Sequence, residues 1–155
     1  MYFANESPFE KFVHLIKRFG FESVDLYYGF YRAEVVKVFD GDDLGRIVVK
    51  VPRVARGESL PPARPLLFWA SKGFGAFFGP RAGDRVIVVF EDGDAARPYY
   101  IGGHYMKDGL PTDLRAGDKG FKVRGFVSAS GLKILLDESA DAATDSTVRI
   151  EPPGG

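Results

Sequence analysis

The sequence predicts an all-β fold with a single helix at its N-terminus. The chain has 155 residues, of which 45% are hydrophobic and 14% aromatic, and this is enough to build one buried core. It contains 19 glycines and 10 prolines, a composition typical of many turns and little long helix. From Arg32 onward, apolar residues recur at every second position in short runs, which is the period of half-buried β-strands.

The predicted helix lies in the segment SPFEKFVHLIKRFG, residues 7–20. Ser7 is expected as the N-cap, Pro8 as the first helical residue and Glu10 as the partner in a capping box, and Gly20 is placed to end the helix. The apolar residues share one face: Phe9, Phe12, Val13, Ile16 and Phe19. This face predicts either packing on the helix's own domain or docking onto a partner subunit.

Two strands joined by a turn rich in aspartate and glycine follow the helix. The run YRAEVVKVF, residues 31–39, precedes the turn, and RIVVKVPRV, residues 46–54, follows it. The second run alternates the apolar set Ile47, Val49 and Val51 with the set Arg46, Val48 and Lys50. Pro52 predicts that the second strand ends there or runs along an edge, because proline has no backbone N–H to donate. A proline-rich loop then leads to LLFWA, residues 66–70, which we expect to form a third strand.

A loop rich in glycine and phenylalanine, residues 71–83, precedes a hairpin that pairs residues 84–91 with residues 98–103. In the first strand of this hairpin both alternating sets of residues are apolar: Val86, Val88 and Phe90 on one side, Ile87 and Val89 on the other. We therefore expect this strand to be covered on both faces. One face can meet the core, and the other requires a helix, a loop or a neighbouring subunit.

Five strands in this order predict a five-stranded OB-type barrel over residues 32–105. Residues 1–31 are then an N-terminal helical segment, 106–120 a polar linker and 121–155 a C-terminal β extension. The extension contains three short strand-like runs: FKVRGFVSASG, LKILLDE and STVRIE. Alternating strands of this kind have uncovered surfaces and edges, so we expect them to need partner strands.

The composition excludes several kinds of site. The chain has no cysteine, which excludes disulfides, thiolate zinc sites and a cysteine nucleophile. Its 21 basic and 21 acidic residues cancel, so no overall positive field attracts nucleic acid or an anionic membrane. No apolar run approaches the roughly 18 residues of a membrane span, and the first residues lack the pattern of a secretory signal.

Two acidic turns imitate known sites without completing them. The turn DGDDLG resembles the start of a calcium loop, but Leu44 stands where a third oxygen ligand belongs and Val51 occupies the twelfth position. Asp92 and Asp94 resemble a carboxylate pair for glycoside hydrolysis, but they lie in a strand-connecting turn that we expect to be exposed. Two histidines are expected to be surface or structural residues: His14 and His104. The sequence therefore predicts no catalytic residue, metal or cofactor.

An OB-type barrel is also typical of modules that bind single-stranded nucleic acid or oligosaccharides. Such a site combines a basic groove with aromatic side chains on which bases or sugars stack. The candidates for stacking are Tyr27, Tyr28, Phe30, Tyr31 and Trp69. The neutral net charge weighs against a nucleic-acid partner, so this function is the alternative rather than the first choice.

One long motif carries a family resemblance. The run GFGAFFGPRAGDRVIVVFEDGDAARPYYIGGHY contains a glycine-aromatic loop, Pro-x-x-Gly-Asp, a valine-rich strand, a Gly-Asp turn, Arg-Pro and a strand ending in glycine. It resembles the OB-fold domain of central spike and baseplate-assembly proteins of contractile phage tails, which are related to the valine-glycine repeat spike proteins of type VI secretion. The motif residues are Gly73, Phe74, Gly75, Pro80, Gly83, Asp84, Val86, Val88, Phe90, Gly93, Asp94, Arg97, Pro98 and Gly102.

The resemblance covers residues 32–105 and, more loosely, residues 120–151, where GFVSASGLKILLDE is similar to the start of the β-prism in such spikes. It implies a non-enzymatic homotrimer that connects the tail hub protein to a membrane-piercing tip protein in the baseplate of a virion. The C-terminal β extension is then a trimeric β-prism stub, in which three copies of the chain cover the strand surfaces. It also implies assembly in the bacterial host cytoplasm, no nucleic-acid partner and no stable membrane insertion in the resting particle. The linker 106–120 is too short for the lysozyme domain that some family spikes carry, so we expect no lytic activity.

The contact surfaces of such a spike adaptor are predicted from its uncovered apolar residues. We expect the glycine-aromatic loop to supply aromatic anchors, because aromatic residues dominate interface energetics. The alternative is that these phenylalanines pack within their own barrel. The full set of predicted contact residues comes from the loop, the helix and the valine-rich strand: Phe74, Phe77, Phe78, Phe9, Phe12, Ile16, Val86, Val88 and Phe90.

Overall fold

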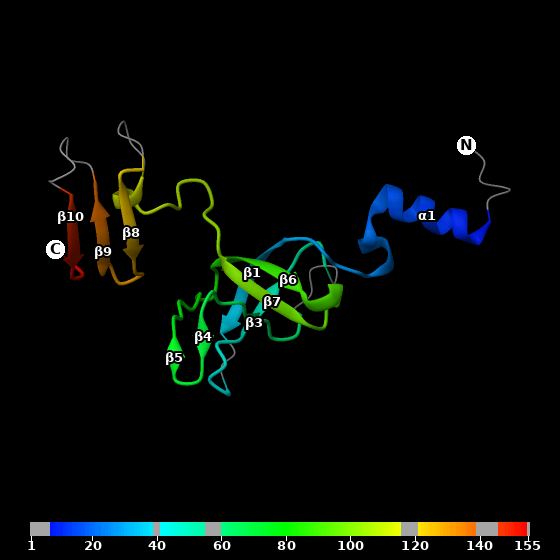
Figure 1. Cartoon of the computed structure of the whole chain (residues 1–155), viewed down its shortest axis with the longest axis horizontal. Coiled ribbons are helices and arrows are strands. Elements are labelled where there is room, and N and C mark those ends of the chain that lie inside the picture. The colour runs from blue at the N-terminus through cyan, green and yellow to red at the C-terminus, as the bar shows by residue number, and fades with distance from the viewer. Residues whose placement is uncertain (1–6, 39–40, 55–59, 116–120, 139–145, 155) are drawn as a thin grey trace. The chain divides into compact units, whose positions relative to one another are not determined.

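The structure, a computed structural model, describes residues 7–38, 41–54, 60–115, 121–138 and 146–154 (Figure 1). The chain forms two compact units, Met1–His104 and Tyr105–Gly155. The described part of the chain is mostly β, with one α-helix and three short 3-10 helices: η1 (Phe21–Val24), η3 (Glu91–Gly93) and η4 (Thr112–Leu114). None of these helices is long and apolar enough to cross a membrane.

The helix α1, Pro8–Phe19, begins as the sequence predicts. The Ser7 hydroxyl accepts a hydrogen bond from the backbone N–H of Glu10 at 3.3 Å, and the Glu10 carboxylate accepts one from the backbone N–H of Ser7 at 2.7 Å. This reciprocal pair is a capping box. Gly20 ends the helix with a φ of 77°, and its N–H donates to the carbonyl of Ile16 at 2.8 Å. The predicted helix is therefore confirmed.

Acid is expected to weaken the start of α1. The backbone N–H of Ser7 and then its hydroxyl lower the pKa of Glu10 below the ordinary value of 4.5. A carboxylate with a lowered pKa stabilises the folded state above its unfolded pKa, and this stabilisation is lost as the pH falls through the folded value. We expect the helical circular dichroism signal to decrease below pH 4.5. Glu10→Gln should reduce this acid-dependent change, and an unaltered change would assign it to other carboxylates.

The unit Met1–His104 is built around a curled five-stranded sheet with the order β2-β1-β6-β7-β3 (Figure 1). Strand β3 lies parallel to β7, and the other neighbours are antiparallel. A bridge between Ile47 and Ala63 ties the segment before β3 back to β2, so the two ends of the sheet come together. This curled sheet is of the predicted OB type. Its strands are β1 (Tyr31–Val38), β2 (Ile47–Lys50), β3 (Arg64–Pro65), β6 (Arg85–Phe90) and β7 (Pro98–Gly103).

The third strand of the sheet lies earlier than the sequence predicts. Residues 66–69 belong to no strand, and Ala70 opens β4 (Ala70–Ser71), which pairs with β5 (Phe74–Gly75) in a separate two-stranded sheet. The prediction of a strand over residues 66–70 is wrong, because the apolar run LLFWA does not mark burial. Within it, the side chain of Phe68 is 84% exposed.

Alternate residues of the long strands fill the inside of the curled sheet. At one end three aromatic rings meet, and the ring centroids of Tyr27, Tyr31 and Phe90 lie 5.5 to 5.9 Å apart. The hydroxyl of Tyr31 donates to Glu22 at 2.9 Å, which gives a buried polar group its partner. The aliphatic part of the core is Ala33, Val35, Ile47, Val49, Val51, Val54, Leu60, Ala63, Val86 and Val88.

The unit Tyr105–Gly155 contains a three-stranded antiparallel sheet with the order β10-β9-β8. Its strands are β8 (Val123–Val127), β9 (Lys133–Asp137) and β10 (Thr147–Glu151). Each strand lies within one of the three strand-like runs that the sequence predicts in this region. Leu135, at the centre of β9, is fully buried on one face of this sheet.

Candidate interaction surfaces

The motif residues before β6 build a turn. Gly83 has a φ of 88°, a left-handed conformation that favours glycine. Its N–H donates to the carbonyl of Val35 at 2.8 Å, and the N–H of Val35 donates to the carbonyl of Asp84 at 2.9 Å. The Asp84 side chain accepts from the backbone N–H of Arg81 at 2.7 Å. The Pro-x-x-Gly-Asp motif therefore holds the start of β6 against β1.

The motif residues between β6 and β7 build a second turn. The carbonyl of Gly93 accepts a hydrogen bond from the N–H of Tyr27 at 2.9 Å, so this turn fastens the chain that leads into β1. The Asp94 side chain accepts from the backbone N–H of Ala96 at 2.8 Å. Pro98 opens β7 opposite Phe90. These contacts position the hairpin, and none of them creates a chemical site.

Arg97 closes the same turn through ion pairs. Its guanidinium lies 3.0 Å from Asp92, 3.3 Å from Asp94 and 3.4 Å from Glu91. Asp92 and Asp94, which resemble a glycosidase pair in the sequence, are both substantially exposed and both bind this guanidinium. The structure thus gives the two carboxylates a structural role in the turn.

Gly102 is the extra residue of a β-bulge in β7. Val86 pairs with Gly103 and Ile87 pairs with Ile101, so Gly102 has no partner in β6. Its φ of 44° is left-handed, as expected for a glycine in such a bulge. The bulge lies near the C-terminal end of β7, and its left-handed residue accounts for the glycine in the motif.

Replacement of Gly93 by alanine is expected to destabilise the curled sheet more than the same change at Gly83. Both glycines have a left-handed φ, which costs alanine roughly 1–2 kcal/mol. A Cβ on Gly93 would also lie 2.9 Å from the ring of Tyr28 and 3.2 Å from the backbone nitrogen of Tyr27, whereas a Cβ on Gly83 meets nothing within 4 Å. Urea denaturation of both variants measures the difference. Equal losses would show that the contacts at Gly93 relax without cost.

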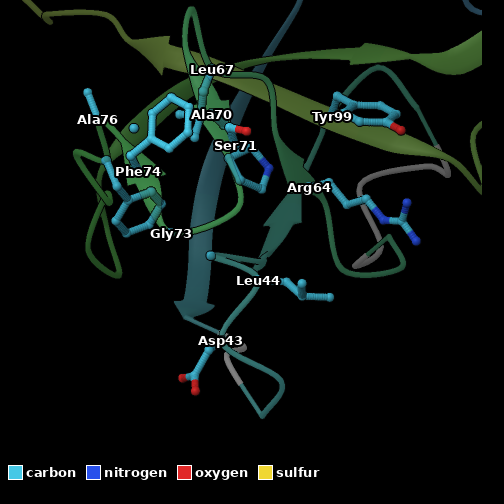
Figure 2. Close-up of a pocket in the computed structure, with 14 residues that line it drawn as sticks. Asp43, Leu44, Arg64, Leu67, Ala70, Ser71, Gly73, Phe74, Ala76 and Tyr99 are labelled. Carbon is cyan, nitrogen blue, oxygen red and sulfur yellow. The ribbon is translucent and has the colours of Figure 1, made fainter.

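A surface hollow with a volume of about 870 Å³ lies between the turn after β1, strand β3 and the β4–β5 hairpin (Figure 2). Phe74 lines it on the hairpin side, and Arg64 and Tyr99 line it on the other. Phe77 also lines the hollow. The Phe77 ring lies so close to Gly45 that a Cβ there would be 2.6 Å from it. The lining of the hollow is largely apolar. Among all the residues that the structure describes, no cluster of three or more side chains could hold a metal ion.

The predicted aromatic anchors lie on the surface of their own unit. Phe74, Phe77 and Phe78 are 59%, 56% and 68% exposed, although the Phe74 ring contacts Trp69 with centroids 5.7 Å apart. The alternative, that these rings pack within the barrel, holds in part for Phe77, which contacts the turn at Gly45. Phe68 adds a further exposed ring that sequence reasoning assigned to a strand. We call residues 66–78 the aromatic segment.

The prediction that Val86, Val88 and Phe90 form a contact surface is wrong. All three are buried in the core of their own sheet, so they are not accessible to a partner. Ile87 and Val89 point the other way and are half-buried, opposite Ile101 and Tyr99 of β7. A strand that is apolar on both sides does not reveal from its sequence which side faces the core.

The helix α1 contains no buried residue. Phe9 is 73% exposed, Phe12 and Phe19 are also exposed, and Ile16 is half-buried. The predicted contact residues of the helix therefore lie together on a face that its own unit leaves open. The polar face carries two basic residues in the last turn, Lys17 and Arg18.

The sheet β8–β9–β10 has two chemically different faces. On the first face Lys133 lies 3.1 Å from Asp113 and 3.6 Å from Glu151, and Arg149 lies 3.2 Å from Asp137. The hydrogen bond to Asp113 raises the pKa of Lys133. The second face, which we call the apolar sheet face, carries five exposed apolar side chains that the strand register places side by side: Phe126, Ile134, Leu136, Val148 and Ile150.

The residues proposed for stacking on a ligand do not form one surface. Tyr27 and Tyr31 are buried core residues, and burial, followed by contacts with Asp25 or Glu22, raises the pKa of both hydroxyls. Tyr28, Phe30 and Trp69 are exposed. The prediction of a stacking surface is therefore wrong for the two buried tyrosines, which lie inside the sheet.

The remaining sequence candidates have ordinary surroundings. In the calcium-like turn Asp40 lies outside the described residues, Asp42 forms an ion pair with Arg46, and Val51 is fully buried in the core. His14 is exposed, and His104 is half-buried. These positions fit the structural roles that the sequence predicts for them.

Comparison with known families identifies the curled sheet. Residues 31–105 match the family model of the type VI secretion system/phage-baseplate injector OB domain, and a search of curated proteins finds no match. The matched residues run from the start of β1 to just beyond the end of β7 and include every turn built by the glycine motif. This is a structural domain of injector baseplates. Residues 31–105 of the chain are an OB domain of the type VI secretion system/phage-baseplate injector family.

Proposed function

We propose that this protein is a homotrimeric central spike or hub adaptor of a contractile-tail baseplate, connecting the tail hub to the membrane-piercing tip. The match of residues 31–105 to the injector OB domain supports a structural role in a baseplate. The observation that carries the finer proposal is the apolar sheet face of the second unit. Its role is mechanical and needs no catalytic residue.

The apolar sheet face is too large and too continuous to suit a solvated surface. In the register of the sheet, Phe126, Ile134 and Ile150 form one row across the three strands. Leu136 and Val148 form the next row with Arg124, whose guanidinium pairs with Glu138 at the edge of the face. Contiguous exposed apolar patches of this kind mark interaction sites in soluble proteins. The opposite face carries the ion pairs of Lys133 and Arg149 and the fully buried Leu135, so the exposed apolar side chains of the sheet lie on the apolar sheet face.

Three copies around an axis satisfy this requirement. Each sheet turns its apolar face inward, where the three faces bury one another, and keeps its ion-paired face in water. The result is a β-prism, which is the shape that the family resemblance implies below the OB domain. A rigid prism transmits force along its axis because bending it would separate the buried faces.

The aromatic segment is the proposed contact with the tail hub protein. It presents exposed rings beside an open apolar hollow, and aromatic residues of this kind supply most of the energy in protein interfaces. Phe74 and Phe78 are the proposed anchors, and Phe77 supports the loop from Gly45. The proposed partners are thus two further copies, a hub protein and a tip protein, without nucleic acid, in a baseplate assembled in the host cytoplasm.

The oligomeric state of the purified full chain tests this function. We expect light scattering to give the mass of three chains, and electron microscopy of the native particle to place the chain on the tail axis. A well-folded monomer at high concentration would overturn the proposal. If that monomer bound oligonucleotides with an affinity that falls steeply with salt, the alternative function of an OB-fold binding module would replace it.

A further inference from the structure

The apolar residues of α1 have the spacing of a coiled-coil seam. Phe9, Phe12, Ile16 and Phe19 are separated by three, four and three positions, which are the a and d positions of two heptads. Side chains three and four residues apart lie on one face of a helix, so these four form a continuous row. None of them is buried in its own chain. A row with this spacing fits against helices that carry the same spacing.

The apolar face of α1 is wider than a two-stranded seam requires. Val13 and Leu15 occupy the e and g positions that flank the row, and Leu15 is exposed. A strict a and d pattern makes a narrow seam, whereas apolar residues at the flanking positions broaden the stripe. One partner helix would leave part of this stripe in water. Two partner helices cover it from both sides.

The charges of α1 are placed so that identical copies can meet. In a parallel bundle of identical helices each residue faces its own copies at the same level, so a charge near the seam would repel itself. His14 occupies an f position, and every charged residue of the helix occupies a b or c position: Glu10, Lys11, Lys17 and Arg18. The Arg18 guanidinium reaches over the ring of Phe19, 5.1 Å from its centroid. The a, d, e and g positions carry no charge. This distribution is the one that self-association requires.

We infer that α1 packs against the α1 helices of two other copies of this chain in a parallel three-helix bundle, an inference that rests on the proposed trimer. The helix has 12 residues, and isolated helices shorter than about 12–15 residues are marginal in water. Linkage through the rest of a trimer raises the local concentration of the three helices to about the millimolar range. The bundle therefore forms as part of the trimer.

Cysteine cross-linking of the full chain tests the bundle, because the natural sequence contains no cysteine. Phe12→Cys places a thiol in the seam, and His14→Cys, two residues away, places one on the outer face. Both variants are oxidised under identical conditions, and covalent dimers are counted on denaturing gels while light scattering reports the oligomer. We expect Phe12→Cys to cross-link at least about tenfold faster than His14→Cys, because only seam thiols share a high local concentration.

The cross-linking rate tests the helix bundle, and light scattering tests the trimer, so the two hypotheses can fail independently. Equal cross-linking rates in an intact trimer would overturn the bundle and leave the proposed function standing, whereas a monomer in light scattering would overturn both. A third outcome is that the two variants cross-link at equal rates and that the trimer sediments together with vesicles of anionic lipid. This outcome would also overturn the bundle, because it would identify a membrane surface as the partner of the apolar face of α1. If Phe12→Cys unfolds the helix, Phe19→Cys, also at a d position, takes its place with the same expected result.

Discussion

Replacement of Val148 by aspartate is expected to convert the trimer into monomers without unfolding the chain. Val148 is 70% exposed in a single chain, so a carboxylate there remains in water and costs little. In the proposed trimer the same position lies inside the prism, where each of three copies would bury an unpaired charge at a cost of several kcal/mol. The loss should be seen as a threefold lower mass in light scattering, with the circular dichroism spectrum retained.

The neighbouring residue provides the matched control for this change. Thr147 is also exposed, but it lies on the ion-paired face of the same strand, where Arg149 already pairs with Asp137 and Glu151. Thr147→Asp should therefore remain trimeric, even though it lies opposite Asp137, because a like-charge pair across an exposed sheet costs less than about 1 kcal/mol. A trimeric Val148→Asp protein would show that the apolar sheet face lies outside the interface.

Replacement of Ile47 by alanine is expected to destabilise the OB domain by about 2–5 kcal/mol, the range for such cavities in a core. Ile47 is 1% exposed, and its backbone exchanges hydrogen bonds with Ala63 where the ends of the sheet meet. The side chain thus packs at the closure of the curled sheet, and little can collapse into the space it leaves. Urea denaturation followed by the fluorescence of Trp69, the single tryptophan, reports the loss.

Val38 is the control for Ile47. It is the register partner of Ile47 in β1, but its side chain is exposed, so truncation to alanine removes little buried surface. We expect Val38→Ala to change the free energy of unfolding by no more than about 0.5 kcal/mol. Similar losses in the two variants would mean that the closure at Ile47 and Ala63 contributes little to the stability of the domain.

Local signals in the sequence predict much of the fold. The Ser7 and Glu10 capping box and Gly20 fix the ends of α1, because a helix terminus is decided by backbone groups within four residues of it. The turn glycines of the motif are equally local, since a left-handed φ restricts the residue that adopts it. The turn glycines also belong to the motif that carries the family resemblance. The OB domain can therefore be recognised from the sequence without knowledge of its strand pairing.

The sequence predicts the contact surfaces less well than the helix ends and the turns. The run LLFWA has the composition of a buried strand, yet Phe68 faces solvent, and no neighbour in the sequence signals this. The sequence does predict that the phenylalanines of the glycine-aromatic loop are exposed, and Phe74, Phe77 and Phe78 lie on the surface although Phe74 and Phe77 keep contacts with Trp69 and Gly45.

The sequence by itself determined the helix ends, the turns of the glycine motif and the alternation of the C-terminal strands, because each depends on residues that are close along the chain. Only the tertiary structure decided that Val86, Val88 and Phe90, rather than Ile87 and Val89, face the core, and that β3 forms at Arg64 and Pro65. Both outcomes depend on the direction in which the sheet curls, and this is set by pairing between strands that are distant in the sequence.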